Sequence, residues 1–359
     1  MKVGIVGMPN AGKSSLFTAL TGAAAEAANY PFTTIDPNVA VVPVADERLD
    51  AVARTVGASR VVPDTITFQD IAGLVAGAHR GEGLGNRFLA NIRETDAILH
   101  VVRVHRDPNV VHPEGRVDPL ADIETIETVL IYADLEQAER RLERVSKAAK
   151  GGDRRAIAEE AWLRELIAAL QRGQPARTVP SPTDLPDAVA TLQPLTAKPV
   201  LYVANVEEGS DQVPPEIARY AESQGEAAVA VSARLEAELA ELGPEEAAAM
   251  RSELGLSESG LDTVLRGAFG LLELIAFFTA DVDKPAQSWH LRRGASAWRA
   301  AGMIHSDMQR GFVRAEVIPW DRLVDAGGYA GARERGTLRL EGRDYVVEDG
   351  DVVTVKFAP

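Results

Sequence analysis

The sequence predicts an α/β protein with a doubly wound, mostly parallel β-sheet, a helical insertion and a small β-rich C-terminal domain. Three observations support this prediction. Short apolar runs rich in β-branched residues alternate with helical patterns, one internal segment has only helical signals, and the last part is dominated by short strands. Nearly continuous apolar strands separated by helices are typical of a parallel sheet that helices cover on both faces.

The sheet should contain six strands. They are expected at residues 3–6, 39–44, 65–68, 98–104, 200–203 and 227–231. Each run is short, apolar and rich in valine, isoleucine or threonine, as strands are.

The helical insertion is expected between the fourth and fifth strands, because residues 122–171 lack strand signals. Glu136–Arg140 and Glu143–Lys147 are opposite charges four residues apart, which favours a helix. Gly151-Gly152-Asp153 should break that helix, and Asp153 can cap the next one. We therefore predict two antiparallel helices that pack mainly on each other.

A separate C-terminal domain is expected from about residue 276. Its runs at 312–317 and 345–347 alternate, and turn residues stand at 341–343 and 348–351. The predicted domains are then a nucleotide-binding domain of residues 1–121 and 195–275, an insertion of 122–194 and a C-terminal domain of 276–359.

Composition limits the class of protein. The 359 residues carry a net charge of −15 from 38 basic and 53 acidic side chains, and contain no cysteine. The absence of cysteine excludes disulfides and thiolate metal sites. We see no signal peptide and no apolar run of about 18 residues, so we expect a cytoplasmic protein without membrane contact. We also expect a monomer. A stretch from Lys284 to Ala315 has six basic residues and one acid, and forms either a solvated face or a contact for RNA phosphates.

Residues 7–14, Gly-Met-Pro-Asn-Ala-Gly-Lys-Ser, fit the phosphate-loop pattern G-x-x-x-x-G-K-[ST] between a strand and a helix. Backbone N–H groups of such a loop wrap phosphates, and the helix N-terminus adds partial positive charge. Lys13 should reach the β- and γ-phosphates, and the Ser14 hydroxyl should bind Mg²⁺.

A second phosphate-sensing motif follows at Asp70-Ile71-Ala72-Gly73. An acid at the end of a strand opposite the phosphate loop can hold Mg²⁺ through water, and the Gly73 N–H can contact the γ-phosphate. Between the two motifs, Thr34 is our choice as a Mg²⁺ ligand, with Thr33 as the competing candidate.

The base motif favours ATP over GTP. Related GTPases have N-K-x-D after the fifth strand, whose aspartate accepts two hydrogen bonds from guanine; here the residues are Asn205-Val206-Glu207-Glu208. The amide of Asn205 can still contact base N7 and, in adenine, the N6 amino group.

The whole chain resembles the Obg-like ATPases of the YchF family. The motifs that carry the resemblance are 10–15 (NAGKSS), 29–35 (NYPFTTI), 70–75 (DIAGLV), 81–86 (GEGLGN), 205–208 (NVEE), 231–236 (VSARLE) and 302–307 (GMIHSD). The resemblance implies a translation-factor-type P-loop NTPase G domain, a coiled-coil-like insertion and a C-terminal TGS domain of β-grasp type. It also implies ATP preference and ribosome association, with the large subunit or the 70S particle. Two departures are Thr33, where cysteine is expected, and Val206-Glu207 inside the base motif.

The expected nucleotide-binding set combines these motifs. It comprises Gly7, Asn10, Ala11, Gly12, Lys13, Ser14, Ser15, Asn205, Val206 and Ser232. The expected metal ligands are Ser14, Thr34 and Asp70.

The attacking water needs an unusual partner, because Leu74 stands where many relatives have a water-orienting glutamine. Backbone groups, His79 and His112 are candidates, and the resemblance favours His112. The expected catalytic set is then His112, Lys13 and Gly73. Asn10 either stabilises its turn or helps to bind K⁺, which makes K⁺ a second candidate cofactor beside Mg²⁺.

The function expected from these observations is an ATPase that acts as a nucleotide-dependent switch on the ribosome, in translation or a stress response. An Obg-type GTPase and a nucleotide-gated scaffold with little catalysis are the alternatives.

Overall fold

The computed structural model describes residues 1–26, 38–71, 84–107, 110, 112, 115–256 and 258–358. The chain divides into two compact units. One contains Met1–Val41 and Thr67–Leu271, and the other contains Val42–Ile66 and Leu272–Pro359. No helix within the described ranges combines the length and apolar character that crossing a membrane requires.

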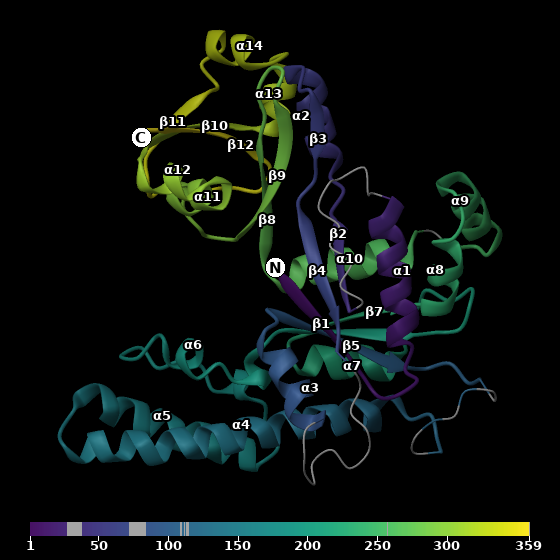
Figure 1. Ribbon diagram of the computed structural model, residues 1–359, viewed down its shortest axis with the longest axis vertical. Helices are drawn as coiled ribbons and strands as arrows, with labels where there is room; N and C mark the ends of the chain where they lie inside the picture. Colours follow the sequence, from purple (N-terminus) through teal and green to yellow (C-terminus); the bar gives the residue numbers. More distant parts are fainter. Residues whose placement is uncertain are drawn as a thin grey trace. The chain divides into compact units, whose positions relative to one another are not determined.

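Six strands form the first sheet, in the order β2-β4-β1-β5-β6-β7 (Figure 1). Their bounds are Lys2–Val6 for β1, Val39–Pro43 for β2, Thr65–Asp70 for β4, Ala97–Arg103 for β5, Val200–Asn205 for β6 and Ala227–Val231 for β7. β1 pairs in parallel with β4 and β5, and β6 pairs in parallel with β5 and β7. All six expected strands are present, and the predicted fold class is confirmed.

Helices cover both faces of this sheet. Successive side chains of a strand point to opposite faces, and in β6 apolar side chains are buried on both faces. Tyr202 of β6 joins a buried core with residues of three helices, α3 (Leu84–Arg93), α4 (Pro119–Lys150) and α7 (Pro215–Ser223). Its neighbour Leu201 faces α10, where a Cβ added at Gly267 would lie 2.8 Å from the Leu201 Cδ2. The helix bounds are Lys13–Glu26 for α1, Leu84–Arg93 for α3, Pro215–Ser223 for α7, Ala233–Leu239 for α8, Pro244–Glu253 for α9 and Gly260–Leu271 for α10.

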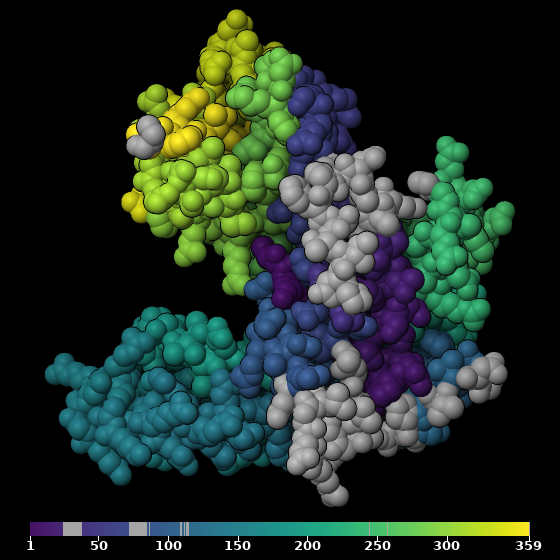
Figure 2. Space-filling view, viewed as in Figure 1, coloured from purple at the N-terminus to yellow at the C-terminus, as the bar shows by residue number. Residues whose placement is uncertain are grey.

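The insertion is the predicted pair of helices, α4 (Pro119–Lys150) and α5 (Arg154–Gln171). Gly152 has a φ of 85°, which ends α4, and the Asp153 carboxylate then accepts the N–H groups of Arg155 and Ala156 at 2.9 and 3.3 Å. Trp162 and Leu166 of α5 share a buried core with Val145 of α4. Figure 2 shows the atoms of this pair in blue-teal as one continuous surface.

A buried carboxylate fixes the return of the chain from the insertion to β6. Three short helices make this return, η2 (Ala176–Thr178), α6 (Ala188–Leu192) and η3 (Leu195–Ala197). Asp134 of α4 accepts the backbone N–H of Leu195 at 2.7 Å, and the N–H and hydroxyl of Thr196 at 2.8 and 2.7 Å.

The second sheet has the order β11-β10-β12-β8-β9-β3 and mixed directions. Its strands are β3 (Arg60–Val62), β8 (Leu274–Thr279), β9 (Pro285–Arg292), β10 (Phe312–Pro319), β11 (Arg339–Glu341) and β12 (Asp351–Phe357). Helices α11 (Ala297–Ile304), α12 (Ser306–Arg310), α13 (Trp320–Asp325) and α14 (Tyr329–Glu334) complete the C-terminal part, and α2 (Glu47–Val56) precedes β3.

One feature of this unit differs from the sequence prediction. Residues 345–347 form no strand; Val346 makes only an isolated bridge to Ser296, and the long strand of this region is β12. Residues Val42–Ile66 lie in the same compact unit as the C-terminal residues. β3 pairs in parallel with β9, a partner more than 200 residues away that local periodicity cannot indicate. The functional domain boundaries stay a prediction.

Candidate nucleotide-binding site

The phosphate loop joins β1 to α1, and both of its glycines are required because neighbouring atoms leave no room for a Cβ. Gly7 has a φ of 154°, and a Cβ there would lie 2.3 Å from the Val101 carbonyl oxygen. Gly12 has a φ of 101°, and a Cβ there would lie 2.1 Å from Nδ2 of Asn205. Side chains are excluded at both positions, so the backbone can curve closely around a ligand.

The start of α1 supplies positive potential to this loop. α1 begins at Lys13, so N–H groups of its first turn have no carbonyl partner within the helix. The Lys13 ammonium is largely buried and donates to the Met8 carbonyl oxygen at 2.8 Å. Burial lowers the pKa of Lys13, while the charge of Asp70 raises it. Ser14 and Ser15 follow Lys13 directly, so both hydroxyls lie in the first turn of α1. Ser14 is exposed and Ser15 is half-buried.

Asp70 ends β4 next to the strand that leads into the loop, because its register partner is Ile5 of β1. Its Oδ1 is buried and has no hydrogen-bond partner among the described residues. Burial raises the pKa of Asp70, and the nearby Lys13 charge lowers it. An unpaired carboxylate oxygen beside the phosphate loop suits a hard cation. Within the described part of the chain, no three histidine or acidic side chains gather as a protein-only metal cluster.

Asn205 fastens the phosphate loop to the next segment of the site. Its buried amide donates from Nδ2 to the Ala11 carbonyl at 3.0 Å, and its Oδ1 accepts the Ala233 N–H at 3.1 Å. Nδ2 also lies 3.4 Å from Nε2 of His105. The amide is therefore already engaged with the protein, and a base that contacts Nδ2 must share it with His105.

The other predicted base-site residues, Val206 and Ser232, are buried, and Ser232 stands directly before α8. The structure thus brings β6 and the start of α8 to the phosphate loop, through Asn205. Asn10 lies in the loop with a left-handed φ of 62° and an exposed side chain.

Arg103 is a buried organising residue that the sequence analysis missed. It ends β5, and its guanidinium donates to the carbonyl oxygens of His105, Asp107 and Val110 at 3.2, 3.1 and 3.0 Å. These bonds hold the segment that leads towards His112. A charged residue at the end of an otherwise apolar strand was the available signal.

His112 is buried and pairs with Asp122, in the first turn of α4. The two side chains meet at 3.0 Å between Nε2 and Oδ2. Burial raises the pKa of Asp122, and the hydrogen bond from His112 lowers it. A carboxylate that binds one ring nitrogen fixes the tautomer and orientation of the imidazole. Asp122 was not among the predicted site residues.

His100 lies in β5 opposite Val6 of β1, immediately before the phosphate loop. Burial lowers the pKa of His100 to about 3, and the positive charge of Lys13 acts in the same direction. The His100 imidazole is therefore neutral at pH 7, and Lys13 carries the positive charge that acts on it.

Several predicted residues lie outside the described part of the chain. They are Thr34 with its competitor Thr33, Gly73, and the histidine alternative His79. Their roles stay predictions.

The chain is similar to known proteins over nearly its whole length. The family model "50S ribosome-binding GTPase" matches residues 2–140, and the YchF-GTPase_C model, "Protein of unknown function (DUF933)", matches residues 274–358. A Haemophilus ducreyi protein named "Ribosome-binding ATPase YchF" is 50% identical over 359 residues, 99% of each chain. The chain belongs to the YchF family. The resemblance recognised in the sequence is thereby confirmed.

Further similar proteins carry the names of an ATPase, a GTPase and a GTP-binding protein. A Bacillus subtilis "Ribosome-binding ATPase YchF" is 47% identical over 364 residues and 99% of each chain. The solved Schizosaccharomyces pombe "YchF GTPase" has a TM-score of 0.88 and 35% identity, and covers 99% of this chain and 97% of its own. A "GTP binding protein" from Pyrococcus horikoshii, with a TM-score of 0.64 and 20% identity over both full chains, shares the fold. These names include both ATPases and a GTPase. The preference of this chain for adenine or guanine therefore has to be argued from its own residues.

Proposed function

We propose that this chain is an ATPase that binds ATP with Mg²⁺, hydrolyses it and acts as a nucleotide-dependent switch on the ribosome. One observation carries the proposal. The phosphate loop has no room for a side chain at Gly7 or Gly12, and Lys13 and the start of α1 adjoin it, beside the unpaired carboxylate oxygen of Asp70. This is the donor set that a magnesium-complexed triphosphate needs.

Each residue has a defined task in this proposal. Backbone N–H groups of the loop and the Lys13 ammonium hold the β- and γ-phosphates, and the Gly73 N–H contacts the γ-phosphate. Ser14, Thr34 and Asp70 would hold Mg²⁺, which neutralises charge that develops on the phosphate oxygens when it is bound. His112 orients the attacking water, with its ring fixed by Asp122.

ATP preference rests on the residues that replace the guanine motif. The Asn205 amide can donate to N7 of either purine, and its oxygen can accept from the N6 amino group, which only adenine has. Glu208 stands where the guanine-binding pattern N-K-x-D has its aspartate, and Val206 replaces its lysine. The bacterial relatives named as ATPases support this choice.

Purified protein with Mg²⁺ is expected to bind ATP roughly tenfold more tightly than GTP, a difference of about 1.4 kcal/mol. Competition of a labelled ATP analogue by unlabelled ATP and GTP measures it. Lys13→Ala is the control, and should weaken both nucleotides together because it removes a phosphate contact. Tighter GTP binding would replace the proposal with an Obg-type GTPase.

K⁺ is proposed as a second cofactor, held near Asn10, whose left-handed backbone lies in the loop. A monovalent cation beside the phosphates adds positive charge where developing negative charge must be stabilised. We expect faster ATP hydrolysis in KCl than in NaCl at equal ionic strength, and little effect of K⁺ on the Asn10→Ala variant. Equal rates in both salts would remove K⁺ from the site.

Ribosome binding, a cytoplasmic location and a monomeric state complete the proposal. The ribosome enters through the names of the relatives, with the large subunit or the 70S particle as the partner. Sedimentation with ribosomes in the presence of a nonhydrolysable ATP analogue tests it. A protein that binds ribosomes normally but lacks turnover would favour a nucleotide-gated scaffold.

A further inference from the structure

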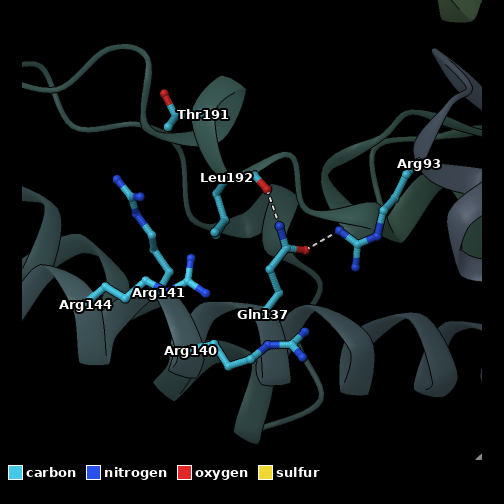
Figure 3. Close-up of a pocket in the computed structure, with 7 residues that line it drawn as sticks. All are labelled: Arg93, Gln137, Arg140, Arg141, Arg144, Thr191 and Leu192. Carbon is cyan, nitrogen blue, oxygen red and sulfur yellow. Dashed lines mark hydrogen bonds between the residues drawn. The ribbon is translucent and has the colours of Figure 1, made fainter. Parts of the chain in front are cut away.

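A second basic site lies away from the phosphate loop, in the same compact unit. A cavity of about 450 Å³ opens between α4, α6 and the end of α3 (Figure 3). Four arginines line it: Arg93 from α3, and Arg140, Arg141 and Arg144 from α4. We call this the arginine pocket.

The walls of the arginine pocket are fixed by side-chain hydrogen bonds. Gln137 accepts from the Arg93 guanidinium and donates to the Leu192 carbonyl of α6, as the dashed lines in Figure 3 show. Arg141 makes a bidentate pair with Glu159 of α5, at 2.6 and 3.0 Å. α3, α4, α5 and α6 are thus tied together around the cavity, which makes its shape a property of the fold.

Positive charge in the pocket exceeds negative charge. Arg141 is paired with Glu159, and Arg140 with the exposed Glu136 at 3.0 Å. Arg144 is exposed and makes no hydrogen bond or ion pair with any described residue. The residues that line the pocket include four arginines and no acidic side chain, on a protein whose net charge is −15.

The arrangement of these charges points to an anionic ligand. Arg140 and Arg144 are four residues apart on one helix, a spacing at which like charges repel each other. Guanidinium groups are planar, hold their charge at every physiological pH and donate paired N–H groups that match phosphate oxygens. A bound oxyanion that accepts from the Arg144 guanidinium would offset this excess of positive charge.

We propose that the arginine pocket is a phosphate-binding site, separate from the nucleotide site, with Arg144 as its principal free donor. The ligand is a phosphoryl oxyanion, carried by a free phosphorylated molecule or by the RNA backbone. Lys13 and the phosphate loop take no part, so the proposal goes beyond the proposed function.

Binding of two probes to the full chain tests the site while the phosphate loop is occupied. The protein is first saturated with Mg²⁺ and a nonhydrolysable ATP analogue, whose binding also reports whether the nucleotide site works. Inorganic pyrophosphate is then titrated by calorimetry, and a short fluorescent RNA by anisotropy. Arg144→Gln should weaken the binding of at least one probe by about five- to tenfold, because it removes a charged donor without disturbing the fold.

Arg154→Gln is the matched control. Arg154 is an exposed arginine at the start of α5 and does not line the pocket, so its loss should leave the affinity for both probes unchanged. An effect confined to pyrophosphate identifies a free phosphorylated ligand, and an effect confined to RNA identifies the polymer. The proposal is overturned if neither probe binds, or if Arg144→Gln and Arg154→Gln weaken binding equally.

Discussion

The His112→Ala variant is expected to hydrolyse ATP roughly 100-fold more slowly, or slower still, while its affinity for ATP stays close to that of the unaltered chain. Leu74 cannot orient the attacking water, so an imidazole is the strongest candidate for that task. Alanine removes both ring nitrogens and therefore the whole contribution of positioned proton transfer. Single-turnover hydrolysis, with ATP affinity measured separately, checks the prediction.

The pairing of His112 with Asp122 allows a sharper version of this experiment. Asp122→Asn keeps the shape of the side chain but removes the carboxylate that fixes the imidazole. Its expected loss in turnover is smaller than that of His112→Ala, about tenfold, as for partners that orient a functional histidine. Both variants need a check of folding, because the pair is buried. Full turnover in folded His112→Ala would exclude this histidine from the mechanism.

The Asp134→Ala variant is expected to lose about 3 to 5 kcal/mol of unfolding free energy, the largest effect on stability that we predict. Asp134 is 1% exposed and accepts three hydrogen bonds, from the Leu195 N–H and from the N–H and hydroxyl of Thr196. Alanine would leave these buried donors without an acceptor and open a cavity beside α4. Urea unfolding followed by circular dichroism measures the change.

Glu136→Ala provides the matched control for Asp134→Ala on the same helix. Glu136 is exposed and pairs with an exposed arginine, and such pairs contribute less than about 1 kcal/mol. ATP affinity of folded Asp134→Ala should be unchanged, because the phosphate loop does not contact this carboxylate in our proposal. A loss below about 1 kcal/mol would show that the return of the chain to β6 does not depend on Asp134.

The sequence alone determined the phosphate loop, because that motif is continuous and its neighbours are local elements. A strand, a glycine-rich loop and a helix follow one another within residues 2–26, so pattern and geometry coincide. The six strands of the first sheet and the break at Gly152 were also predictable. Apolar runs and a glycine pair act locally, whatever the rest of the chain does.

Tertiary structure alone decided the partners of the site residues. Asp122 meets His112, and Asn205 meets Ala11 although 194 residues separate them. Arg103 has three carbonyl partners that no side-chain pattern announces. Likewise, β3 joins the second sheet through β9. The local pattern of apolar residues indicates which face of a helix or strand is buried. Which residue packs against that face depends on the path of the chain between elements that are far apart in the sequence.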